Sequence, residues 1–91
     1  MQPADVMEEL LQIADAANIE VRSTRVGVAG EADANAASGV CRVQGRVWVV
    51  LSHADPVDVQ LDVLAEALRD HASDEIERRF LPPAVRELLG A

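Results

Sequence analysis

Residues 39–52, with the sequence GVCRVQGRVWVVLS, constrain the fold of this chain more than any other stretch. Two runs rich in β-branched residues flank Gln44 and Gly45. A two-residue connection that contains glycine is typical of a tight β-hairpin, because such turns need a positive φ. We therefore predict two antiparallel strands joined at Gln44 and Gly45.

The second strand of this hairpin is apolar on both faces, with Val47, Val49 and Leu51 on one side and Trp48 and Val50 on the other. A strand of this kind is expected to be central in its sheet or covered on both sides. We expect Trp48 in the core. Because aromatic side chains are favoured at the centres of interfaces, Trp48 and Val50 are also the candidates for a dimer interface.

Residues 4–17 repeat apolar side chains at spacings of three and four, which predicts an amphipathic helix with Asn18 as its C-terminal cap. The face predicted to be buried consists of Val6, Met7, Leu10, Leu11, Ala14 and Ala17. The next residues, 19–25, begin with the apolar and polar alternation of a strand that has one buried face.

A second helix is predicted to begin with Asp55 as N-cap and Pro56 at the first helical position. Its predicted buried face consists of Val57, Leu61, Leu64, Ala65, Leu68 and Ala72. A short helical turn over residues 74–80, a break at Pro82 and Pro83, and a last helix closed by Gly90 complete the chain.

These elements predict one α+β domain over residues 1–91, in the order α-β-β-β-α-α, with helices packed on a three-stranded sheet that is at least partly antiparallel. Residues 27–39 have no periodicity and consist mostly of glycine, alanine, serine, asparagine and acids. We expect a flexible loop there, and connections of this length are usually functional or disordered.

Composition limits the partners and the compartment. Sixteen acidic residues against eight arginines, with no lysine, give a net charge of −8, which argues against nucleic acid and anionic membranes as partners. The chain has no apolar run long enough to span a membrane, and its N-terminal residues lack the pattern of a signal peptide. The single cysteine, Cys41, fits a reducing compartment, so we expect a cytoplasmic protein, and the richness in alanine, valine and arginine favours a GC-rich bacterial source.

Acidic residues recur every four positions along the second helix and just beyond it, at Asp58, Asp62, Glu66, Asp70 and Asp74. Like charges at this spacing repel, and only Arg69 is near enough to offset them. These five residues are the candidate binding surface for a basic protein, and the alternative is a solvated helix face. Four arginines belong to the strands or their ends: Arg22, Arg25, Arg42 and Arg46. A basic sheet side opposed to the acidic helices would steer a basic partner to the second helix or pair two copies head to tail.

Two other groups of residues are weak candidates for chemistry. Glu66 and Asp70, with His71, would offer ligands to Mg²⁺, Ca²⁺ or Mn²⁺. Cys41 with His53 or His71 would suit a nucleophile, although a thiol inside a hairpin strand is more often a buried structural one. Neither group forms a complete metal-binding or catalytic site, so we expect no cofactor, no metal and no catalysis.

The order of elements over residues 10–70 resembles the first part of the small zinc metallopeptidase domains of the ImmA/IrrE type, in which a hairpin leads into a helix with an HExxH motif. SGVCRVQGRVWVVLS matches the hairpin and QLDVLAEALRDH matches the helix. Glu66, Ala67 and Asp70 stand where the first histidine, the general-base glutamate and the second histidine would fall. The resemblance therefore implies the fold without zinc proteolysis.

Most of the chain also looks like a set of short uncharacterised bacterial proteins that share a Gly-Leu-Cys-Arg-type strand, a VLAEAL helix and an LPPAVRELL ending. The expected function is that of a non-catalytic interaction or adaptor module that self-associates. The alternatives are a metal-binding or degenerate peptidase-like protein, and an antitoxin or inhibitor of a basic partner.

Overall fold

The structure is a computed structural model that describes residues 2–24 and 38–90. Its elements run in the order α-β-β-β-α-α-α: α1 (Pro3–Ala16), β1 (Glu20–Thr24), β2 (Gly39–Val43), β3 (Arg46–Ser52), α2 (Val57–His71), α3 (Ser73–Arg78) and α4 (Pro83–Leu89). The predicted α+β class is confirmed, and the short turn expected after the second helix is a helix of its own, α3. Most of the predicted loop 27–39 lies outside the described residues, while Gly39 already belongs to β2.

The sheet has three strands in the order β1-β3-β2. β1 runs parallel to β3, with Glu20 opposite Trp48, and β2 runs antiparallel to β3, with Cys41 opposite Trp48. The prediction of a partly antiparallel sheet with the tryptophan strand at its centre is confirmed. The two strands that follow each other in sequence, β1 and β2, therefore form opposite edges.

The turn between β2 and β3 has the geometry that its two residues predict. Gln44 has a φ of 52° and Gly45 a φ of 82°. Two consecutive positive φ angles define the type I′ turn, whose twist matches the right-handed twist of the strands that it joins. The hairpin is therefore specified locally, by its own turn chemistry.

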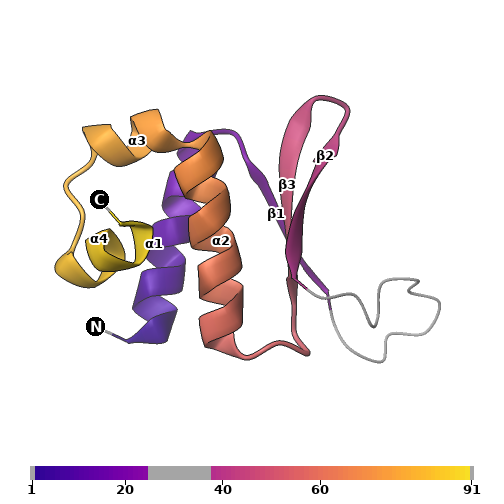
Figure 1. The fold of residues 1–91 in the computed structure, drawn as a ribbon, viewed down its shortest axis with the longest axis horizontal. Helices are drawn as coiled ribbons and strands as arrows, with labels where there is room; N and C mark the ends of the chain where they lie inside the picture. The colour runs from indigo at the N-terminus through magenta and orange to yellow at the C-terminus, as the bar shows by residue number, and fades with distance from the viewer. Residues whose placement is uncertain (1, 25–37, 91) are drawn as a thin grey trace.

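The helices cover one face of the sheet (Figure 1). Alternation along β3 turns Val49 and Leu51 into the core, where both are buried, and leaves Trp48 and Val50 half-buried on the opposite face. None of the elements that the structure describes packs over that second face. The expectation that Trp48 lies in the core is wrong, because the helices that the structure describes pack on the other side.

The helices bury most of the residues that periodicity predicted. Leu11 of α1 and Val57 of α2 are exceptions, since both are exposed. Ile13 and Ala67, which were not predicted, are fully buried. The remaining core side chains of these two helices are Val6, Leu10, Ala14, Leu61, Leu64, Ala65 and Leu68.

The predicted cap at Gly90 is confirmed, whereas Ala17 occupies the C-cap position of α1 and Asn18 is the residue after it. Asn18 follows α1 with a φ of 62°, and Gly90 follows α4 with a φ of 70°, both in the left-handed region that ends helices. Within residues 2–24 and 38–90, no helix has the length and apolar character needed to cross a membrane.

Candidate interaction surfaces

Four carboxylates form an exposed line along α2: Asp58, Asp62, Glu66 and Asp70. We call these four residues the acidic stripe. The fifth predicted member, Asp74, which the sequence places just beyond the second helix, belongs to α3. Ala72 leaves the helical region with a φ of −136° and separates α2 from α3.

The acidic stripe has no cation paired with it among the described residues. The ion pairs found there involve the carboxylates of Glu20 and Glu75. Arg69, expected to offset the stripe, instead donates from Nη1 to the backbone oxygen of Leu88 at 3.0 Å and so ties α2 to α4. Asp70 also lies in the last turn of α2, where the helix dipole disfavours negative charge.

The weak metal candidates lie only partly together. Asp70 and His71 line a hollow of about 280 Å³ at the junction of α2 and α3, whereas Glu66 does not line it. Over residues 2–24 and 38–90, no group of three or more histidine, cysteine, aspartate or glutamate side chains is arranged to hold a metal ion. Ala67, at the general-base position of the peptidase resemblance, is buried in the core.

The candidate nucleophile and the two histidines lie on separate parts of the fold. Cys41 is in the middle of β2, His53 follows the end of β3, and His71 ends α2; all three are exposed. The expectation of a buried thiol at Cys41 is wrong, because β2 is an edge strand and Cys41 shares the uncovered face with Trp48.

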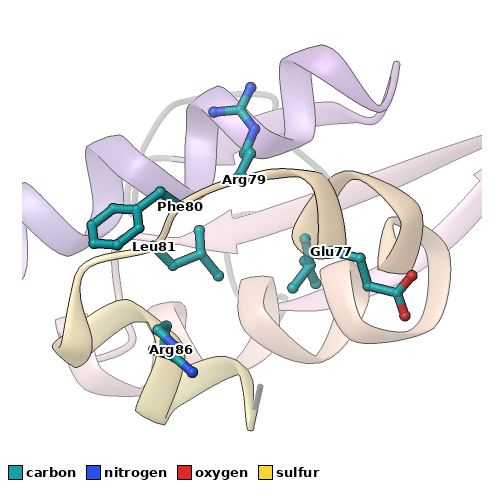
Figure 2. Close-up of a pocket in the computed structure, with 6 residues that line it drawn as sticks. Glu77, Arg79, Phe80, Leu81 and Arg86 are labelled. Carbon is teal, nitrogen blue, oxygen red and sulfur yellow. The ribbon is translucent and has the colours of Figure 1, made fainter.

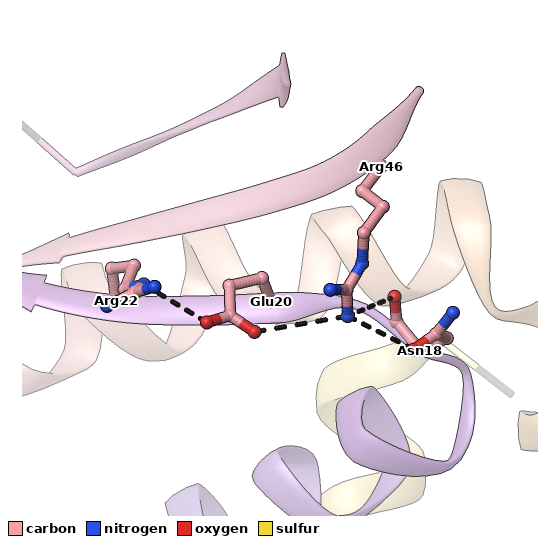
Figure 3. Close-up of polar contacts among 4 residues, drawn as sticks. All are labelled: Asn18, Glu20, Arg22 and Arg46. Carbon is pink, nitrogen blue, oxygen red and sulfur yellow. Dashed lines mark hydrogen bonds and ion pairs between the residues drawn. The ribbon is translucent and has the colours of Figure 1, made fainter. Parts of the chain in front are cut away.

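The uncovered face of the sheet carries Trp48 at its centre, with charged side chains beside it. The guanidinium of Arg22 lies 5.0 Å from the centroid of the Trp48 ring, a cation–π distance. Glu20 accepts from Arg22 at 3.1 Å and lies 4.0 Å from Arg46, which also bonds the side-chain oxygen of Asn18 at 3.1 Å (Figure 3). The two predicted interface candidates, Trp48 and Val50, therefore lie on one accessible face.

Charge is divided between the two sides of the molecule as predicted for the described residues. β1, β2 and β3 carry three arginines against one glutamate, whereas α1 carries four acidic residues and no basic one. Arg25, the fourth predicted member of the basic side, lies outside the described residues.

Comparison with family models, curated proteins and solved structures found no match. The resemblance to the peptidase domains and to the short bacterial proteins stays a prediction, and the function is argued from the geometry alone.

A polar corner at the start of α2 is a feature that sequence reasoning missed. The carboxylate of Asp55 accepts the backbone N–H of Ser38 at 2.9 Å, and the Ser38 hydroxyl accepts the backbone N–H of Ser52 at 2.9 Å. The bonds from the Ser38 backbone and then its side chain lower the pKa of Asp55 from its usual 3.8. Asp55 caps no helix, since Pro56 occupies the N-cap position, so the predicted cap is wrong.

Phe80 is a second missed feature. It is the only phenylalanine of the chain and is 94% exposed, on the connection between α3 and α4. It borders a hollow of about 240 Å³ with Ile76, Glu77, Arg79, Leu81 and Arg86. Figure 2 shows Arg79 and Leu81 on opposite sides of that connection. The pair of prolines after Leu81 marks an irregular segment, but no pattern in the sequence shows that Phe80 faces the solvent.

Proposed function

We propose that this chain is a non-catalytic interaction module that binds a basic segment of another protein along the acidic stripe of α2. One observation carries the proposal: the four carboxylates are exposed on a single helix, and no described cation pairs with them. Like charges four residues apart destabilise a helix by a few tenths of a kcal/mol per pair. A basic ligand would supply the missing cations and relieve that repulsion.

The position of Arg69 adds to this support. Its guanidinium is the nearest cation in sequence to Glu66 and Asp70, yet it is directed to the Leu88 carbonyl of α4. The acidic stripe is therefore open to an external cation along its length. Arginine or lysine side chains of a partner would bind it with charge-assisted hydrogen bonds.

The non-catalytic part of the proposal is supported by the separation of the reactive side chains. Cys41, His53 and His71 come from three different parts of the fold. The position that matches the peptidase general base is the buried methyl group of Ala67. A protein that acts by binding needs none of these groups.

Binding of this kind has a characteristic dependence on salt. Complementary charge accelerates encounter between the partners, and dissolved ions screen that attraction over a Debye length of about 10 Å at 0.1 M. We therefore expect the association rate to fall as the salt concentration rises. The basic side of the molecule, formed by the sheet, would orient a basic partner toward the helices.

Charge reversal on α2 tests the proposal. The double variant Asp62→Lys with Glu66→Lys is compared, as bait in affinity capture from a lysate of the source organism, with a matched variant, Glu8→Lys with Asp15→Lys. Both pairs are exposed, and both change the net charge by the same amount. We expect wild type and the α1 variant to retain a common basic protein that the α2 variant loses.

Two outcomes would contradict the proposal. One is capture of the same proteins by all three baits. The other is equal loss in both double variants, because that result assigns the binding to net charge and not to α2. The α2 variant should melt no lower than wild type, since it relieves repulsion, and this comparison separates loss of binding from unfolding.

An inhibitor or antitoxin that covers a basic site of its target would use the same acidic stripe, and the same observation favours it. In that case the protein captured through α2 is basic and loses its own activity when the wild-type chain is added. The α2 double variant should leave that activity unchanged.

A further inference from the structure

The outer edge of β2 presents a short row of backbone groups to the solvent. In a hairpin with a two-residue turn, the residues that flank the turn form a hydrogen-bonded pair, and such pairs alternate along the ladder. The Val43–Arg46 pair is therefore bonded, as is the Cys41–Trp48 pair. The N–H and C=O groups of Arg42, which lies between these two positions, point away from β3, and those of Val40, on the other side of Cys41, do the same.

We propose that β2 pairs antiparallel with β2 of a second copy, about a two-fold axis that passes beside Cys41. In this register Val40 of one copy is opposite Arg42 of the other, so every outward N–H and C=O of both residues finds a partner. The sheet then continues through six strands. This inference concerns the sheet edge and is independent of the proposed binding by α2.

The neighbouring symmetric registers fit less well. A two-fold axis at Arg42 would place Val40 opposite Gln44, which belongs to the turn. An axis at Val40 would place Arg42 opposite Ser38, whose N–H is already bound by the Asp55 carboxylate at 2.9 Å. Only the axis at Cys41 pairs both outward residues with each other.

The side chains on both faces of β2 also fit the register with the axis at Cys41. Val43 of one copy lies opposite Gly39 of the other on the uncovered face, and a Cβ atom added at Gly39 would meet nothing within 4 Å. The space beside Gly39 is therefore free to receive Val43, which is exposed in the single chain. On the helix side, the methylene groups of Arg42 would cover Val40.

The charge distribution favours contact between two copies at their sheet edges over contact at their helices. The strands carry three arginines and one glutamate, whereas the acidic residues of the described chain are concentrated on the helices. Two copies of a chain with a net charge of −8 repel each other least when they meet at their strands. Cys41 is opposite Trp48 in the register, so the two Trp48 side chains would flank the axis on the uncovered face.

A substitution at the edge tests the pairing. Val40→Lys places a lysine opposite Arg42 of the second copy, and lysine at an edge opposes strand pairing. Val59→Lys on α2 is the matched control, because Val40 and Val59 are 43% and 40% exposed. A five-residue strand makes a small interface, so sedimentation equilibrium is run under reducing conditions at a concentration on the order of 0.5 mM.

We expect a dimer for wild type and for Val59→Lys, and at least a tenfold weaker association for Val40→Lys. A monomeric wild type under these conditions overturns the proposal, as does a Val40→Lys variant that associates as strongly as wild type.

Oxidation of Cys41 tests the register without altering the strand. Residues opposite each other in a non-hydrogen-bonded antiparallel pair have Cα atoms about 4.5 Å apart, within the range of a disulfide. Diamide takes up the two hydrogen atoms lost by the two thiols. The controls are the double variants Cys41→Ser with Val40→Cys and Cys41→Ser with Val43→Cys, which move the thiol off the axis while keeping it exposed.

We expect covalent dimer from wild type in at least tenfold higher yield than from either control. Equal yields in all three proteins overturn the register, because they indicate random collision of exposed thiols.

Discussion

Asp55 lies at the corner where β3 turns into α2, and its carboxylate joins that corner to the start of β2 through the backbone of Ser38. A hydrogen bond to a charged acceptor is stronger than one to a neutral acceptor. The stability of this corner therefore depends on the ionisation of Asp55.

Replacement of Asp55 by alanine should lower the thermal unfolding midpoint at pH 7, because the Ser38 N–H loses its acceptor. The pKa of Asp55 is lowered from 3.8 in the folded chain. Stability from the charged carboxylate is thus present above about pH 4 and is lost as the pH falls through the folded pKa. Thermal melts followed by circular dichroism from pH 7 to pH 2 should show the gap between wild type and Asp55→Ala closing at the acidic end. A gap that does not change with pH would contradict this role.

At the scale of single elements, the hairpin depends on its turn. Both turn residues have positive φ angles, and a Cβ atom at Gly45 would meet nothing within 4 Å, so only the backbone conformation opposes a side chain there. Glycine and asparagine tolerate this conformation best.

Gly45→Ala should therefore lower the free energy of unfolding by roughly 1–2 kcal/mol, the cost of the left-handed region for an ordinary residue. Gln44→Asn should raise it by a few tenths of a kcal/mol, since Asn-Gly is the preferred type I′ pair. Urea denaturation of both variants measures the two effects. If both substitutions shift the midpoint in the same direction, the type I′ assignment is wrong.

At the scale of the whole molecule, all the described helices pack on one face of the sheet, and the core is confined to that side (Figure 1). Leu64 on α2 is completely buried there, whereas Leu11 on α1 is 38% exposed. The same substitution at these two positions therefore compares the interior with the surface.

Leu64→Ala should lower the free energy of unfolding by about 2–5 kcal/mol, as for other buried leucines. Leu11→Ala should cost less than about 1 kcal/mol, because its side chain is already partly hydrated. Guanidinium denaturation measures the free energy of unfolding of both variants. Similar losses at both positions would show that α1 has a different buried face.

The fold was predictable because its signals are local. Helical spacing indicated α1 and α2, and the pair Gln44-Gly45 indicated the hairpin. Positions that depend on distant elements were not predictable in the same way. The DPxD pattern predicted a cap at Asp55, but Ser38, distant in sequence, binds its carboxylate. Cys41 was expected to be buried, and its exposure follows from the order of the strands, which no local pattern specifies.

The acidic stripe shows the same limit. The spacing of its carboxylates was visible in the sequence, and α2 ends before Asp74, at Ala72. The bond from Arg69 to the Leu88 carbonyl was not visible, because it joins α2 to a distant helix, and it directs the cation expected to offset the stripe to α4. The register that joins Cys41 to Trp48 was likewise defined only by the three-dimensional pairing.

The position of Trp48 has a spectroscopic consequence. The chain contains one tryptophan, one phenylalanine and no tyrosine, so its absorption at wavelengths longer than those of phenylalanine, and its emission above 300 nm, come from this one indole. Trp48 is half-buried on the uncovered face, beneath the guanidinium of Arg22 and opposite Cys41. Its emission wavelength therefore reports on changes at the sheet face. Changes confined to α2, α3 and α4 do not alter the Trp48 emission directly.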